Sequence, residues 1–398
     1  MIGHALDPAL FRGLAELEAT QRGWLPHRLP GHARARCSDP QVAAAESQPS
    51  GVRLAFRTRA TVIEIDVLPT RVVISGVPPR PDGTVDLLVD GELTQQHSTT
   101  GGDRVTVDPR TGRTVIEPGA VGTVRFDGLP RVDKDVEVWL PHHERVEVVA
   151  LRTDAPITMM PRTSHPTWLH HGSSISQGSN AASPSTTWPA IAAAQAGVDV
   201  TNLGLAGSAM LDPFTARTIR DTPADLLSLE IGINLVNGDV MRRRAFEPAV
   251  HGFLDTMRDG HPVAPLLVIG PLYCPIHENT TGPSAFDPDA LAAGRIAFRA
   301  TGEDVDGAAA ATPLDRLTLS MIRTELSRIV AQRAVADPQL FYLDGCELYG
   351  PADAPEHPLA DNLHPDAATH RIIGERFARL ALTGRGPLTI PNPAPQPQ

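Results

Sequence analysis

Ser174 and the pair Asp361 and His364 are residue types that together can carry out nucleophilic chemistry. A serine hydroxyl is a poor nucleophile near neutral pH and needs a base within about 3 Å. The imidazole of His364 can supply that base, since an ordinary imidazole titrates near pH 6.5. Asp361 lies three residues before His364, so in a tight turn its carboxylate can accept the Nδ1–H and fix the tautomer. This combination predicts attack of Ser174 on a carbonyl carbon.

Attack on a carbonyl carbon creates an oxyanion, which needs hydrogen-bond donors that are already in place. Two further short motifs offer them: Asn202-Leu-Gly-Leu-Ala-Gly207 and Gly232-Ile-Asn234. The backbone N–H groups of Ser174 and Gly207 and the side-chain amide of Asn234 are therefore the predicted oxyanion hole. The loss of one such donor typically lowers turnover by about 10²- to 10³-fold.

The elements that must position these residues follow an alternating pattern after Pro166. Apolar runs typical of buried strands alternate with helical stretches, which predicts a doubly wound parallel sheet of five strands, a flavodoxin-like α/β fold. Ligands bind such sheets at the carboxyl ends of the strands, and each candidate motif follows a strand. The predicted strands are 167–172, 198–203, 226–231, 266–269 and 340–344, and the predicted helices are 187–197, 209–220, 243–259, 314–336 and 366–382.

The first part of the chain has a different pattern. Short apolar–polar alternations separated by Gly, Pro and Asp predict an antiparallel β-sandwich or jelly roll before the α/β domain. We expect three parts: a β-sandwich domain over 1–160, a catalytic α/β domain over 161–385, and a disordered Pro-rich tail over 386–398. The long connection 275–313 emerges at the catalytic edge and is predicted to cover it. The expected N-terminal strands are 52–56, 61–67, 84–89, 114–116, 122–126, 136–140 and 146–149.

Four motifs in register give the chain a resemblance to the SGNH, or GDSL-type, hydrolase family. They are the motifs that begin at Gly172, Asn202 and Gly232, and the motif Asp361-Asn-Leu-His-Pro365. The resemblance covers about 165–383 and implies the same nucleophile, oxyanion donors and catalytic pair. It departs from the family pattern at Ser173, where the family usually has an Asp that shapes the turn. A β-sandwich ahead of such a domain is similar to the second carbohydrate-esterase family.

Each candidate residue also has a purely structural interpretation. Ser174 can cap a helix, because serine is a favoured N-cap, and His364 can simply end a loop. Gly207 can serve only a turn, and Asn234 can cap a helix. The neighbouring His170 and His171 invite a zinc site, but successive strand residues face opposite sides of a sheet, so they cannot form one site together. The agreement of all four motifs favours the catalytic interpretation.

Composition narrows the remaining classes. The formal net charge is −11 and the sequence has no dense basic stripe, which argues against nucleic-acid binding. It contains no apolar stretch of about 18 residues and no signal-peptide pattern, so we expect no membrane association and a cytoplasmic location. Three scattered cysteines (Cys37, Cys274 and Cys346) fit a reducing compartment. No ligand-spaced carboxylate cluster is visible, so we expect neither metal nor cofactor.

The sequence thus predicts a serine-dependent acyl-ester enzyme that forms an acyl-Ser174 intermediate. Its partners are expected to be a small-molecule acyl donor, as an ester or thioester, and a hydroxyl acceptor. Whether water or a sugar or metabolite hydroxyl takes the acyl group stays open, because both outcomes use the same intermediate. A carbohydrate-binding protein with an inactive esterase domain is a more remote alternative. Metal-dependent phosphate-ester hydrolysis is disfavoured, and the oligomeric state is left open.

Overall fold

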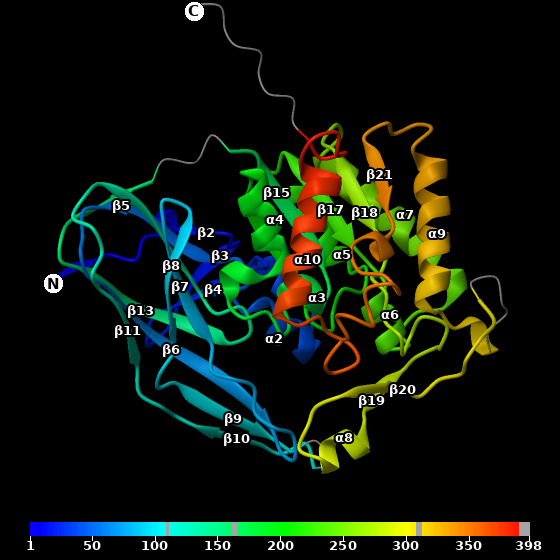
Figure 1. Cartoon of the computed structure of the whole chain (residues 1–398), viewed down its shortest axis with the longest axis horizontal. Coiled ribbons are helices and arrows are strands. Elements are labelled where there is room, and N and C mark those ends of the chain that lie inside the picture. The colour runs from blue at the N-terminus through cyan, green and yellow to red at the C-terminus, as the bar shows by residue number, and fades with distance from the viewer. Residues whose placement is uncertain (109–110, 161–164, 308–312, 390–398) are drawn as a thin grey trace, which may run out of the picture.

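The computed structural model describes residues 1–108, 111–160, 165–307 and 313–389. An N-terminal region built of β-sheets lies beside a C-terminal region in which helices surround a central sheet (Figure 1). Most of the Pro-rich tail predicted over 386–398 lies outside the described residues. The boundary predicted at residue 160 stays a prediction, since 161–164 are also outside them.

The N-terminal region contains two sheets that share one apolar core. The eight-stranded sheet has the order β10-β9-β6-β13-β4-β3, with β1 on β13 and β11 on β6, and the six-stranded sheet has the order β14-β5-β12-β7-β8, with β2 on β5. Alternate residues of both sheets, such as Phe56 and Ile65, are fully buried in this core. The strands are β1 (Ile2–His4), β2 (Phe11–Arg12), β3 (Glu16–Ala19), β4 (Trp24–His27), β5 (Arg53–Thr58), β6 (Ile63–Ile74), β7 (Thr84–Val89), β8 (Glu92–Ser98), β9 (Asp103–Val107), β10 (Thr114–Glu117), β11 (Gly122–Phe126), β12 (Lys134–Trp139), β13 (Arg145–Thr153) and β14 (Ile157–Met159).

Pairing in these two sheets is antiparallel, as predicted, with one exception: β6 and β9 run parallel. The expected strands all occur, and β6 is longer than expected because its second half pairs with β9. Two short helices, α1 (Gly31–Arg34) and α2 (Pro40–Glu46), precede β5. Together with β1 to β4 they occupy a stretch in which the sequence analysis predicted no elements.

The C-terminal region is the predicted parallel five-stranded sheet, in the order β16-β15-β17-β18-β21. A two-stranded hairpin, β19–β20, stands apart from it. The strands are β15 (Thr167–Gly172), β16 (Asp199–Gly204), β17 (Leu226–Glu230), β18 (Leu266–Ile269), β19 (Ser284–Phe286), β20 (Phe298–Ala300) and β21 (Leu340–Leu343). The helices are α3 (Ser174–Gln177), α4 (Trp188–Ala196), α5 (Pro213–Asp221), α6 (Ile233–Asn237), α7 (Arg243–Gly260), α8 (Pro288–Ala292), α9 (Leu319–Arg333) and α10 (Ala367–Phe377).

Helices cover both faces of this sheet, as two neighbouring residues of β15 demonstrate. The ring of His170 lies 4.7 Å from that of Trp188 in α4, whereas the ring of His171 lies 6.0 Å from that of Phe253 in α7. Successive residues of a strand point to opposite faces, so α4 and α7 pack on opposite sides. The carboxyl ends of the strands therefore stay open between the two helical layers, where loops can build a site.

None of the helices in the described ranges is both long enough and apolar enough to cross a membrane.

Candidate active site

Ser174, His364 and Asp361 form one continuous chain of hydrogen bonds at the carboxyl edge of the sheet. The Ser174 Oγ lies 2.9 Å from His364 Nε2, and His364 Nδ1 lies 2.8 Å from Asp361 Oδ2. Ser174 opens α3 directly after β15, and His364 lies in the loop before α10. All three residues are less than 10% exposed: Ser174 7%, His364 6% and Asp361 9%.

The ionised carboxylate of Asp361 decides which nitrogen of His364 donates a hydrogen bond. Burial alone would raise the pKa of Asp361, but hydrogen bonds and charge from His364 and the backbone N–H of Leu363 outweigh it and lower the pKa to about 2. An ionised carboxylate only accepts, so His364 donates through Nδ1–H and Nε2 faces the Ser174 hydroxyl. Asn180 donates a further bond to Asp361 Oδ2 at 3.2 Å. This arrangement can remove the Ser174 proton.

Three hydrogen-bond donors in the loops at this edge of the sheet have no acceptor in the described part of the chain. Ser174 is the first residue of helix α3, so its N–H has no acceptor within the helix. The N–H of Gly207 is also unpaired, and its φ of 71° is a left-handed conformation that favours glycine. Asn234 accepts the Ala209 N–H through Oδ1 at 3.0 Å, which fixes the amide and leaves its NH₂ group free.

The turn before the nucleophile is held by a residue that the sequence analysis missed, Glu230. Its Oε2 accepts the Ser173 N–H at 2.9 Å, and the Ser173 hydroxyl caps the Ile175 N–H at 3.3 Å. Glu230 is 1% exposed, and its burial raises the pKa of its carboxyl. The buried carboxyl therefore helps to hold the turn in which Ser173 replaces the usual Asp. The available sequence signal was a Glu at the end of the apolar run 226–230.

His170 belongs to a buried hydrogen-bond network under this turn. The indole N–H of Trp168 donates to Ser228 Oγ at 2.8 Å, and the same hydroxyl is hydrogen-bonded to His170 Nδ1 at 2.7 Å. The opposite nitrogen, Nε2, is hydrogen-bonded to Ser176 Oγ at 2.8 Å. Its neighbour on the other face, His171, bonds the Leu203 carbonyl instead.

His170 and His171 thus have separate hydrogen-bond partners on opposite faces of the sheet. Over the described ranges, no group of three or more His, Cys, Asp or Glu side chains is arranged to hold a metal ion.

The N-terminal region is bonded directly to the loops of this site. Arg28 is fully buried and donates to the carbonyls of Asn202 and Gly204 at the end of β16. The Ser50 hydroxyl donates to the Gln177 carbonyl at 2.6 Å, at the end of α3. Gln41 in α2 donates to the Ala206 carbonyl at 2.9 Å, next to Gly207. The N-terminal region therefore helps to hold helix α3, which begins at Ser174, and the loop that carries Gly207.

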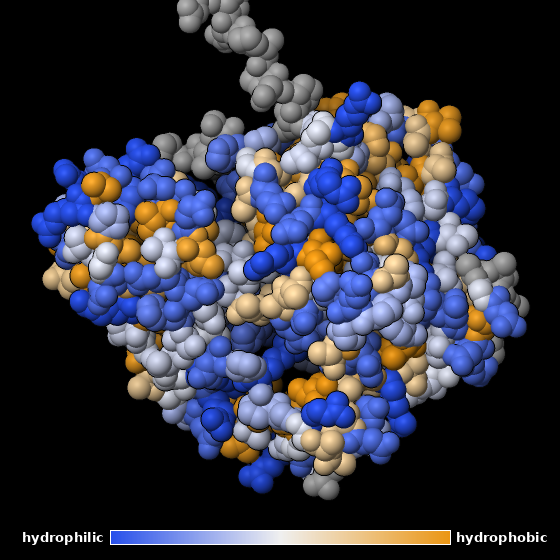
Figure 2. Space-filling model, viewed as in Figure 1, coloured by the Kyte–Doolittle hydropathy of each residue, from blue (hydrophilic) through white to orange (hydrophobic). Residues whose placement is uncertain are grey.

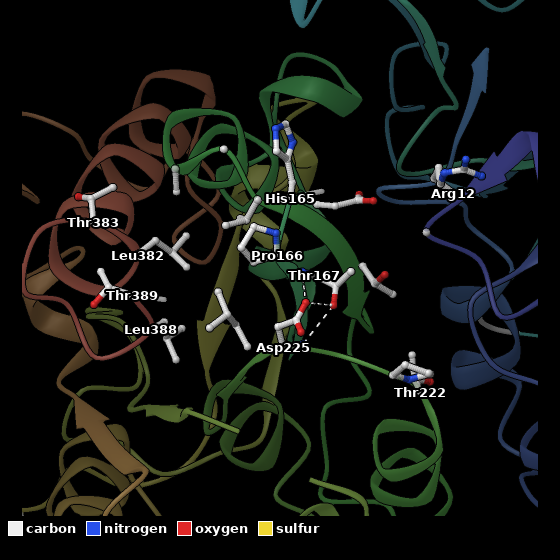
Figure 3. A pocket seen from close by; sticks show the side chains of 18 of the residues that line it. Arg12, His165, Pro166, Thr167, Thr222, Asp225, Leu382, Thr383, Leu388 and Thr389 are labelled. Carbon is white, nitrogen blue, oxygen red and sulfur yellow. Dashed lines mark hydrogen bonds between the residues drawn. The ribbon is translucent and has the colours of Figure 1, made fainter. Parts of the chain in front are cut away.

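A large cavity lies at the opposite edge of the sheet. About 1340 Å³ in volume, it is lined by residues at the amino ends of β15, β16 and β17, including Thr167 and Asp225, and by Leu382 and Leu388 near the C-terminal end (Figure 3). Asp225 Oδ2 accepts both the N–H and the hydroxyl of Thr167, at 2.7 and 2.8 Å. No serine–histidine pair lines it, so this cavity is separate from the chain of hydrogen bonds at Ser174.

Comparison with known proteins agrees with this geometry. Residues 168–274 match the model of the GDSL-like Lipase/Acylhydrolase family. The structure of the salicylyl-acyltransferase SsfX3 from a tetracycline biosynthetic pathway is similar over 94% of each chain, with 27% identity and a TM-score of 0.73. The chain is thus similar to serine-dependent acyl-ester enzymes of the SGNH type. The resemblance to the SGNH family is thereby confirmed, as is the expectation of a serine-dependent esterase or acyltransferase.

Two more distant structures share the fold. A putative GDSL-like lipase from Bacteroides ovatus is 19% identical, with 92% of this chain and 93% of that chain covered and a TM-score of 0.62. A family two carbohydrate esterase from Clostridium thermocellum is 14% identical, with 83% and 91% covered and a TM-score of 0.54. Among curated proteins, no relative matches this SGNH-type chain.

Proposed function

We propose that this SGNH-type enzyme uses Ser174 as its nucleophile, with His364 as general base and Asp361 as the group that orients His364. Ser174 N–H, Gly207 N–H and the Asn234 amide are the proposed oxyanion donors. The observation that carries this proposal is the unbroken hydrogen-bond chain from Ser174 Oγ to Asp361, at the sheet edge whose loops also hold three donors without acceptors. A nucleophile, a base and an oriented donor set are the parts that acyl transfer requires.

In the proposed reaction, Ser174 Oγ bonds to the carbonyl carbon of an ester or thioester while its proton passes to His364 Nε2. The carbonyl oxygen becomes an oxyanion and is bound by the three donors. As the carbonyl re-forms, the bond to the leaving group breaks, and His364 returns the proton to that group. The product is acyl-Ser174. A hydroxyl then attacks the acyl carbon and gives its proton to His364. The bond between that carbon and Ser174 Oγ breaks, and His364 returns the proton to Ser174 Oγ.

We propose that the hydroxyl belongs to a small molecule, such as a sugar or another metabolite, rather than to water alone. The full-length similarity to an acyltransferase supports this choice. A cytoplasmic location, which stays a prediction, also supports it, because acyl thioesters and small acceptors are available there. Hydrolysis remains the second candidate, since the carbohydrate esterase shares the fold.

Intact-mass measurement after exposure to a panel of acyl esters and thioesters tests the proposal. An acyl adduct on the wild type that is absent from Ser174→Ala is the expected result. Turnover of a short p-nitrophenyl ester would further exclude an inactive carbohydrate-binding protein.

Adding increasing amounts of an alcohol or sugar acceptor separates transfer from hydrolysis. We expect product to shift from acid to ester and the effect to saturate. A product ratio that tracks acceptor concentration without saturation would mean that no acceptor site exists.

A further inference from the structure

The β19–β20 hairpin is fixed to the loop that carries His364. The Phe298 N–H donates to the Asp361 carbonyl at 2.9 Å, and the Asn362 side chain donates to the Phe298 carbonyl at 3.1 Å. These bonds join strand β20 to Asp361 and Asn362, which lie in the same loop as His364. The hairpin is part of the segment 275–313 predicted to cover the site, of which 308–312 lie outside the described residues. The hairpin therefore forms a wall beside His364.

This wall presents two aromatic rings. The Phe298 ring lies 5.8 Å from the His364 ring at an interplanar angle of 76°, an edge-to-face contact. Phe286 pairs with Phe298 across the hairpin, and the two rings stack at 5.1 Å. Phe286 is 37% exposed, so its ring is available to a ligand. Ala285 and Arg299, one residue along each strand, point to the other side.

Surface shape agrees with a binding role for these rings. In Figure 2 the surface is hollowed between the hairpin, at the lower right, and the N-terminal region, and apolar atoms are visible at the rim of the hollow. Ligand sites are typically concave and lined by aromatic side chains. Flat groups stack favourably on such rings, in offset or edge-to-face arrangements.

We propose that Phe286 and Phe298 form a subsite for a flat apolar group on the alcohol side of the substrate, a proposal that rests on the proposed function. His364 exchanges its proton with the leaving oxygen and with the accepting hydroxyl, so whatever is attached to that oxygen lies beside His364. The carbonyl oxygen lies instead with the donors of Gly207 and Asn234. Phe298, which packs on His364, and Phe286, which stacks on Phe298, therefore contact the alcohol or acceptor rather than the acyl chain.

Two ester series test this assignment. Benzyl acetate against ethyl acetate varies the alcohol, and ethyl benzoate against ethyl acetate varies the acyl group. We expect Phe286→Leu and Phe298→Leu each to lower the benzyl-to-ethyl ratio of kcat/KM by roughly three- to tenfold, mainly through KM. The matched control is Arg299→Ala, on the same strand but the opposite side, which should leave the ratio unchanged.

The outcomes distinguish a failure of the proposed function from a failure of the aromatic subsite. If wild-type Ser174 is not labelled by a fluorophosphonate, the proposed function itself fails. If labelling is normal but both ratios stay within twofold of wild type in Phe286→Leu, the aromatic subsite is overturned. This variant alters a partly exposed ring, so loss of folding does not obscure the result. A change confined to the ethyl benzoate series would overturn the assignment to the alcohol side.

Discussion

The two edges of the parallel sheet differ in how their polar groups are satisfied. At the carboxyl edge, the Ser174 hydroxyl reaches His364 at 2.9 Å while the N–H of Gly207 stays without an acceptor. At the amino edge, a cavity of about 1340 Å³ is lined by two carboxylates that already have partners. Asp225 is bonded to Thr167, and Asp199 is bonded to Arg53.

This difference favours the carboxyl edge, rather than the cavity, as the place of the proposed chemistry. A carboxylate whose lone pairs already accept protein donors gains little from binding a ligand, because each new bond replaces an existing one. A buried donor without an acceptor has the opposite property: it gains a bond only when an oxyanion arrives. The predictions that follow test this contrast between the edges.

The largest effect is expected at the nucleophile. Ser174→Ala should lower ester turnover by roughly 10⁴- to 10⁶-fold, because it removes the group that carries the acyl intermediate. His364→Ala should fall in the same range, since both act as one unit. Turnover assays with a folded protein, checked by circular dichroism, measure this. Fluorophosphonate labelling that persists in Ser174→Ala would contradict the assignment of the carboxyl edge.

A smaller loss, up to about 10⁴-fold, is expected for Asp361→Asn, which keeps the shape but weakens the orientation of His364. Asp366→Asn is the matched control, because Asn caps α10 as well as Asp does. Equal losses in the two variants would mean that Asp361 has only a structural role.

The pKa of about 2 at Asp361 also gives a pH prediction. This value is depressed below the ordinary 3.8, so the stability that Asp361 contributes is complete above about pH 4 and is lost as the pH falls towards 2. The free energy of unfolding of wild type and Asp361→Asn, measured across this pH range, checks the prediction. A difference between the two proteins that does not change with pH would contradict it.

The next smaller loss of activity is expected at Asn234, a proposed oxyanion donor. Asn234→Ala should lower kcat by about 10²- to 10³-fold, with a much smaller change in KM, because the amide binds charge that forms only in the transition state. Asn237→Ala, in the same helix α6, is the control and should stay near wild type. A loss seen mainly in KM would place Asn234 in ground-state binding instead.

The smallest effect on activity is expected at the amino edge. Asp225→Ala removes the acceptor of two Thr167 hydrogen bonds and should lower the free energy of unfolding by about 1 kcal/mol. Ester turnover should stay within twofold of wild type at a temperature where the variant is folded. A large loss of turnover without a loss of stability would show that this cavity takes part in the reaction after all.

Much of the fold follows from local patterns. The strands predicted at 167–172 and 266–269 agree with β15 and β18 residue for residue, because an apolar run bounded by turn residues is a strong local signal. The strands and helices before residue 51 were not predicted, since β2 has only two residues and α1 only four. The parallel pairing of β6 with β9 depends on contacts between strands, which no local pattern encodes.

The candidate site divides in the same way. The sequence by itself determined the residue types and their order: Ser174 after one strand, Gly207 and Asn234 after two others, and Asp361 three residues before His364. These features are local, and the topology of a parallel sheet brings strand ends to one edge. Only the tertiary structure decided that Glu230 holds the nucleophile turn, that Arg28 bonds the end of β16, and that Phe298 packs on His364. Each of these contacts joins residues 57, 174 or 66 positions apart, so it depends on how whole elements pack and leaves no trace in local spacing.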